Sequence, residues 1–237
     1  MIRQTIVGLV LIVFAGVATA ESGGLFTGRV VKPGVAPDMS VEAMYIKYGD
    51  GSQMGGRISK VLNDKMIGYA DYSKIDSDLE IGSSSPLDFS GNSIGAGVFY
   101  LMPDKLEGRL PSMLDDYDVA AQLSYHKISL GNDETLISGG GSAIDIDSET
   151  TVIAVSLVIS SLEPIQDNGL HWYGSVGVER ISNKLAMSLA GVPDLTDSST
   201  EFAAALGVVL PTEFGEVYGG LEYSDGAIYG VGARYHF

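Results

Sequence analysis

Three observations predict that this chain is all-β, folded as an antiparallel up-and-down transmembrane β-barrel of about ten strands. The chain opens with an export signal, and its later apolar stretches are too short for a spanning helix, which needs roughly 20 residues. Segments of alternating apolar and polar residues follow residue 40, and the clearest of them ends on Phe237. A closed barrel pairs every backbone group between strands, as hydrocarbon demands of a chain that crosses it without helices.

Residues 1–20 have the features of a cleaved signal peptide. Arg3 supplies the positive charge, residues 6–17 are an apolar core, and Ala18-Thr19-Ala20 is a small-x-small cleavage site. An N-terminal membrane anchor is the alternative, but the segment is short for a span. Residues 21–39 contain several glycines and prolines and are expected to form a flexible arm, which leaves 40–237 for the barrel.

The composition excludes several functional classes. The chain has no cysteine, so disulfides, thiolate metal sites and cysteine nucleophiles are impossible. It has 14 Lys+Arg against 30 Asp+Glu, a net charge of −16. Nucleic-acid binding needs clustered basic residues that release counterions, so this balance argues against such a partner.

Turn residues divide the region after residue 40 into ten period-two segments. The connection at 50–52 is short, and merging the strands that flank it would give a smaller barrel of eight strands. An even strand count puts both barrel ends on the periplasmic side and the long polar connections 76–90, 131–149 and 182–200 outside. The expected strands are 41–48, 53–62, 65–75, 91–102, 117–130, 150–160, 169–181, 201–210, 214–224 and 227–237.

The last segment has an apolar face, which includes Val231, Tyr235 and Phe237, and a face of small and polar residues. In this respect the sequence resembles the bacterial outer-membrane β-barrel proteins of the porin-like or OmpA-like class, whose last strand commonly closes with an aromatic residue. The resemblance covers roughly 41–237 and consists of patterns rather than fixed residues. It implies a Gram-negative outer membrane, insertion by the barrel-assembly machinery, and contact with outer-membrane lipids and lipopolysaccharide.

Aromatic residues fall near the two ends of the expected strands, as the interfacial girdles of a membrane barrel would require. The alternative is that aromatic residues simply favour strands. The expected periplasmic girdle is Tyr100, Tyr117, Trp172, Phe214, Tyr235 and Phe237, and the expected outer girdle is Tyr48, Tyr72, Phe202, Tyr223 and Tyr229.

With the apolar face outward, the inward positions carry more acids than bases. These groups either line a narrow, cation-favouring passage or pair across the interior and plug it. General porin diffusion is not expected, because wide channels need about 16 strands or more. The lumen-facing candidates are Glu42, Arg57, Asp71, Asp118, Gln122, His126, Glu179, Glu216, Glu222 and Arg234.

Two of the long connections repeat a D-x-D-x-E spacing, which puts three carboxylates on one face of an extended chain. Oxygen ligands of this kind suit Ca²⁺ or Mg²⁺, with bridging to lipopolysaccharide phosphates as the expected use. The alternative is a merely acidic, solubilising surface. The two triplets are Asp76, Asp78 and Glu80, and Asp145, Asp147 and Glu149.

A few outer-membrane barrels are enzymes, either omptin-type proteases or lipid A-modifying hydrolases. Of the three histidines, only His126 could lie near the outer rim, and Ser124 is the nearest nucleophile in the sequence. No third, orienting group is visible beside them. We therefore expect no enzymatic activity and no cofactor, and a structural or surface-interaction role, with a rim-located hydrolase as the alternative.

Overall fold

The computed structural model describes residues 38–49, 51–79, 87–102, 117–132, 136–137, 143–167, 169–188, 193–224 and 226–237. The expected signal peptide, nearly all of the 21–39 arm and the connection 103–116 lie outside these residues. Within the described ranges, no helix is long and apolar enough to cross a membrane.

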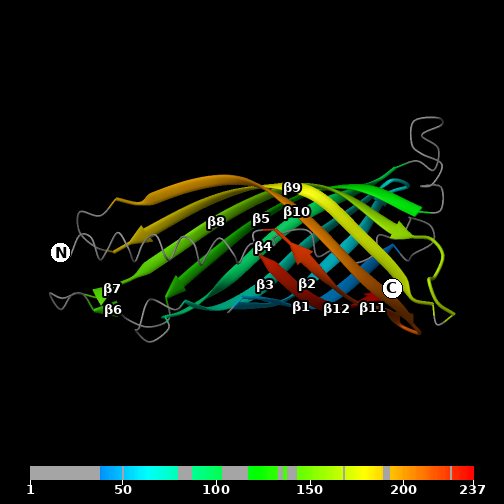
Figure 1. Ribbon diagram of the computed structural model, residues 1–237, viewed down its shortest axis with the longest axis horizontal. Coiled ribbons are helices and arrows are strands. Elements are labelled where there is room, and N and C mark those ends of the chain that lie inside the picture. The colour runs from blue at the N-terminus through cyan, green and yellow to red at the C-terminus, as the bar shows by residue number, and fades with distance from the viewer. Residues whose placement is uncertain are drawn as a thin grey trace.

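Ten strands close into an antiparallel barrel in the order β1-β12-β11-β10-β9-β8-β5-β4-β3-β2, which confirms ten strands over eight (Figure 1). The two remaining strands, β6 (Leu136–Ile137) and β7 (Ala143–Ile144), form a separate small sheet. The barrel strands are β1 (Met39–Tyr48), β2 (Gly51–Asn63), β3 (Met66–Leu79), β4 (Leu87–Leu101), β5 (Tyr117–Asn132), β8 (Ile146–Ser161), β9 (His171–Met187), β10 (Leu195–Thr212), β11 (Gly215–Tyr223) and β12 (Ala227–His236).

Side chains alternate between the lumen and the outer surface of the wall. In β1, Glu42 and Met44 are buried, whereas Val41 and Tyr45 are 42% and 45% exposed. The same alternation on the other strands gives the barrel an outward apolar belt, including residues such as Leu123, Val176 and Leu221 in addition to the aromatic residues. An outer surface of this kind is stable in lipid and would be unfavourable in water.

The seam between β1 and β12 closes the barrel. Val41 pairs with Tyr235, and the amide of Phe237 donates a hydrogen bond of 3.1 Å to the carbonyl of Met39. The rings of Tyr235 and Phe237 stack on the outer surface with centroids 6.0 Å apart. The C-terminal aromatic residues therefore lie on the outer surface beside the strand pair that closes the barrel.

The aromatic girdles need one correction. Tyr48 was expected in the outer girdle, but its side chain points inward and is 4% exposed. It is the last residue of β1 and lies opposite Gly51, so its ring fills space that a larger partner would occupy. Tyr45 lies on the outward face instead.

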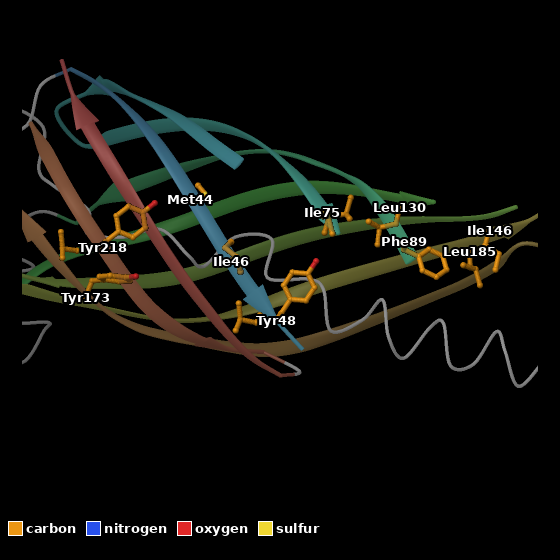
Figure 2. Packing of buried hydrophobic residues seen from close by; sticks show 13 residues of the cluster. Met44, Ile46, Tyr48, Ile75, Phe89, Leu130, Ile146, Tyr173, Leu185 and Tyr218 are labelled. Atoms are coloured by element: carbon orange, nitrogen blue, oxygen red, sulfur yellow. The ribbon is translucent and has the colours of Figure 1, made fainter. Parts of the chain in front are cut away.

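The three long connections are shorter than the sequence suggested, because the strands around them continue. β3 and β4 run into 76–90, β5 and β8 run into 131–149, and β9 and β10 run into 182–200. Their composition is polar, but buried apolar residues such as Phe89, Ile146 and Leu185 still occur on the inner side. Figure 2 shows three of these buried residues, Phe89, Ile146 and Leu185, together with Ile75 and Leu130, which directly precede two of the connections.

The continued strands make the wall uneven. β8, β9 and β10 have 16, 17 and 18 residues, whereas β1, β11 and β12 have 10, 9 and 10. Every one of these strands has one end at the rim that holds the C-terminus. The longer strands therefore extend past the shorter ones at the opposite end of the barrel (Figure 1). We call this projecting part the long wall.

Inside the barrel, three tyrosines lie over glycines of the neighbouring strand. Tyr69 pairs directly with Gly97, Tyr173 with Gly207, and Tyr218 with Gly232, and all three tyrosines are buried. A Cβ at any of these glycines would come within 2.4 Å of the tyrosine ring. The glycines are therefore required by the close approach of a ring, since only a residue without a side chain leaves that space.

Candidate functional site

The register brings most of the expected lumen residues into one continuous row. Each member is the direct cross-strand neighbour of the next, over seven consecutive strands from β11 through β12 and β1 to β5. The charges alternate along it, with one glycine before the final histidine. We call this set the charged row, and its members in order are Glu216, Arg234, Glu42, Arg57, Asp71, Gly95 and His126.

Arg234 is the centre of the first part of the charged row. Its Nε lies 3.1 Å from Oε1 of Glu42, and its Nη1 lies 3.0 Å from Oε2 of Glu216. The hydroxyl of Tyr218 donates a hydrogen bond of 2.8 Å to the other oxygen of Glu42. His236 lies farther off, with Nε2 at 3.8 Å from Glu216. Both carboxylates therefore have a cationic partner.

Arg57 and Asp71 form the second part of the charged row. Nη2 of Arg57 lies 3.1 Å from Oδ2 of Asp71, and Nε2 of His126 lies 3.1 Å from Oδ1 of the same carboxylate. His126 reaches Asp71 across β4 because Gly95 stands between them. A Cβ at Gly95 would lie 2.0 Å from the His126 ring and 2.5 Å from Asp71. This position thus needs a residue without a side chain.

A layer of neutral polar groups continues from the charged row. The guanidinium of Arg57 lies 4.3 Å from the ring centroid of Tyr69, a cation–π contact. The Tyr69 hydroxyl accepts a hydrogen bond of 2.8 Å from Nε2 of Gln122. The hydroxyl of Ser156 in turn donates to Oε1 of Gln122 at 3.1 Å. The hydrogen-bonded groups therefore extend from β2 to β8.

The charged row is sheltered from solvent. Its ionisable side chains are at most 11% exposed, and that value belongs to Asp71. Buried charges need partners, and here each acid of the row has a base within about 3 Å while Arg57 and Arg234 each have one or more acids. This row is therefore a charge-paired part of the barrel interior.

Three further lumen candidates lie outside the charged row. Asp118 on β5 and Glu222 on β11 are 4% and 2% exposed. Glu179 on β9 is 0% exposed and lies directly opposite Glu201 of β10. None of the described residues donates a hydrogen bond to either carboxylate oxygen of Glu179. The structure thus places all ten candidates at inward positions but gathers only six of them into the row.

The first acidic triplet lies mainly beyond what the structure describes. Asp76 is exposed on the outward face of β3, whereas the side chain of Asp78 and the whole of Glu80 are outside the described part of the chain. No coordination geometry follows from Asp76 alone.

The second triplet is not arranged around a common point. Asp147 and Glu149 are exposed on the outward face of β8, and Asp145 precedes that strand. Glu149 pairs with Lys127 of β5 at 3.0 Å. Across the described ranges, no group of three or more His, Asp and Glu side chains is placed to hold a metal ion. The Ca²⁺ or Mg²⁺ site stays a prediction.

The candidate catalytic pair does not form a hydrolytic geometry among the described residues. His126 is 3% exposed, and its Nε2 is engaged by Asp71. Ser124 lies two residues away on the same strand and is 2% exposed, and its hydroxyl makes no hydrogen bond to His126 in the structure. A hydrolase requires a nucleophile and a base within hydrogen-bond reach, in a site that substrate can enter.

Basic residues on the outside form a second feature, which sequence reasoning missed. Lys47, Lys74, Lys127 and Arg180 lie on the outward faces of β1, β3, β5 and β9. Each of these bases comes two residues after an exposed apolar or aromatic residue of the belt. Those belt residues are Tyr45, Tyr72, Tyr125 and Val178. We call these four bases the basic collar. The recurring pattern of a belt residue, one inward residue and a base could have revealed the collar.

The register places the basic collar at one level. Lys74 pairs with Met54, which pairs with Tyr45 on β1. Lys74 therefore lies level with the residue two positions before Lys47. The same offset of two residues recurs from Lys74 to Lys127 and from Lys127 to Arg180. Tilted barrel strands need a steady offset of this kind for residues to share one height. The collar therefore follows the outer edge of the apolar belt around four of the strands.

The closed barrel, its apolar belt and its polar, charge-paired lumen define the class. The chain is an outer-membrane β-barrel protein, located in the bacterial outer membrane, because an antiparallel closed barrel with this alternation is the solution for spanning that bilayer with strands.

Comparison with known proteins gives no family beyond that class. No protein-family model and no curated protein matches the sequence. Among solved structures, the translocator domain of the autotransporter NalP from Neisseria meningitidis is 11% identical, with coverage of 99% of this chain and 98% of that one and a TM-score of 0.47. The N-terminal β-barrel domain of Pseudomonas aeruginosa OprF is 12% identical, with 85% and 99% coverage and a TM-score of 0.36. Ail of Yersinia pestis is 15% identical, with 84% and 95% coverage and a TM-score of 0.33.

Proposed function

We propose that this protein is a non-conducting, non-enzymatic outer-membrane barrel with a structural and surface-interaction role. The charged row is the observation that carries the proposal. Its acids and bases are paired with one another at about 3 Å and sheltered from solvent, which supports a lumen filled by side chains over one that holds a water path. The long wall, which projects at the end opposite the C-terminal rim, supplies the surface for interaction.

Planar-bilayer recording tests the closed lumen. Purified, refolded protein is expected to show no discrete ion-selective steps in 1 M KCl. The lumen carboxylates of the charged row that could bind passing cations are already in ion pairs with Arg57 and Arg234. A porin of known conductance serves as the positive control for incorporation. Regular cation-selective steps from the wild-type protein would contradict the proposal and favour the narrow cation passage, in which the unpaired Glu179 would be the first group to examine.

The basic collar supports a more specific partner, the phosphate groups of lipopolysaccharide. Cationic side chains just beyond an apolar belt lie where the phosphates of an outer leaflet lie, and each base near an anionic membrane surface contributes about 1 kcal/mol. Lys47, Lys74 and Arg180 are exposed on the outside of the barrel. Their outward aromatic and apolar neighbours would hold the acyl chains at the level just below.

Thermal unfolding in micelles with and without added lipopolysaccharide checks this. The triple variant Lys47→Gln, Lys74→Gln and Arg180→Gln should lose more than half of the lipopolysaccharide-dependent rise in Tm, since binding to the folded state sets that rise. The matched control is Lys60→Gln with Lys65→Gln, two exposed bases at the opposite end of the barrel. An equal loss in both variants would mean that general charge, not the collar, governs the effect.

A further inference from the structure

One strand of the long wall has an open edge. β10 pairs with β9 from Leu195 to Val209, but it pairs with β11 only from Ala204 to Thr212. Residues 195–203 therefore have a ladder partner on one side only among the residues that the structure describes. Nine residues of extended chain span about 30 Å. In Figure 1, β10 continues well past the ends of β11 and β12.

An edge of this kind presents a row of backbone donors and acceptors that can pair with another chain. The residues of the edge are mostly exposed, and none of them is Pro, Lys or Arg. Thr196, Ser198 and Thr200 point outward, above the exposed ring of Phe202 that marks the apolar belt. Residues 196–200 of the edge thus lie beyond the belt, where they are accessible from the medium, and Phe202 lies in the belt itself.

The inner side of the edge carries an acid pair without a base. Glu201 is the direct cross-strand partner of Glu179, and like charges directly opposite each other are unfavourable. Glu179 is 0% exposed, and neither of its carboxylate oxygens receives a hydrogen bond from the described residues. Glu201 receives one hydrogen bond of 2.7 Å, from the hydroxyl of Ser199. In the charged row, by contrast, each carboxylate has a cation beside it.

The charges decide between two possible occupants. If a second copy added its own edge about a twofold axis at Ser199, Asp197 of one copy would face Glu201 of the other. That arrangement adds acids to an edge that already has an excess of them, so it is disfavoured. A strand with a lysine or arginine beside Glu201 would instead place a cation next to Glu201, one strand away from Glu179.

We propose that the open edge of β10 binds an extended basic peptide by strand addition, with a cationic side chain of the peptide seated at the Glu179–Glu201 pair. Backbone pairing along 195–203 supplies affinity, and the side chain at the acid pair supplies selectivity. This specifies the partner for the surface-interaction role proposed above. It extends the alternation of charge seen in the row to a directly opposed acid pair that lacks a base among the described residues.

The test uses the whole protein in detergent micelles and a capped nine-residue peptide of alternating threonine and lysine. Fluorescence anisotropy of the labelled peptide at 0.15 M salt should give saturable binding, and Glu201→Gln should raise Kd at least tenfold. Glu163→Gln removes the same charge from an exposed position outside the strands and should change Kd less than twofold. Retained SDS-resistant, heat-shifting mobility shows that each variant is folded.

A second peptide separates strand addition from simple attraction to an acidic protein. Replacing every threonine of the probe by proline preserves its charge but removes its ability to pair as a strand, so binding should weaken at least tenfold. Equal binding of both peptides, an equal effect of Glu163→Gln and Glu201→Gln, or no binding at all would overturn the proposal. If the barrel shows no conductance, any of these results would overturn the peptide-binding proposal but not the proposal of a non-conducting barrel. The two proposals can therefore fail separately.

Discussion

Replacing Arg57 by methionine is expected to lower the free energy of unfolding by about 3–5 kcal/mol, the usual cost of removing one partner from a buried ion pair. Arg57 lies between Glu42 and Asp71 in the charged row and is 4% exposed. Its loss leaves Asp71 with His126 alone. Urea unfolding in micelles, followed by the fluorescence of the single tryptophan, Trp172 on β9, measures the change.

Two controls make this result specific. Lys60→Met removes a charge from an exposed, outward position on β2 and should change stability by about 0.5 kcal/mol or less. Adding Asp71→Asn to the Arg57→Met variant should restore part of the loss, because it removes the carboxylate that has lost its arginine partner. Equal effects of Arg57→Met and Lys60→Met would show that the row contributes no pairing energy.

Gly207→Ala is expected to destabilise the barrel by about 1–3 kcal/mol, the range for overpacking a tight interior. The added Cβ would lie 2.3 Å from the ring of Tyr173, which is 1% exposed and fills the lumen beside β10. The ring would have to leave its position over the glycine. The same unfolding measurement reports this change.

Gly226→Ala is the matched control, because a Cβ there meets nothing within 4 Å. Shortening the ring, as in Tyr173→Leu, should make Gly207→Ala less harmful than it is in the wild-type background. If Gly207→Ala and Gly226→Ala had the same small effect, the tyrosine would not depend on the glycine opposite it.

The fold and the list of inward residues could be predicted because both follow from alternation along single strands. In β12, Arg234 falls between Ala233 and Tyr235, so one face was identifiable without knowledge of its neighbours. The charged row could not be predicted in this way. Its pairing of Glu42 with both Arg234 and Arg57 depends on the register of three strands, and turns and barrel closure set that register.

The remaining differences arise where local composition conflicts with pairing. Residues 196–200 are polar and their composition predicts a loop, yet they continue the β10 ladder because β9 offers a partner for each of them. His126 could be placed on the inner face, but its approach to Asp71 depends on Gly95 from a third strand. A contact that depends on a glycine in a third strand leaves no periodic signal in the sequence.

Disulfide cross-linking at the seam tests the charged row most directly, since the chain has no cysteine of its own. Ala43 and Ala233 are direct partners on the outward face, next to Glu42 and Arg234. Direct partners have Cβ atoms close enough for a disulfide, whereas positions two residues apart on the facing strand do not. Ala43→Cys should therefore cross-link rapidly with Ala233→Cys and not with Val231→Cys. Preferential cross-linking to Val231→Cys would indicate a register that differs by two residues. In that register Glu42 and Arg234 would not be direct partners, which would contradict the charged row.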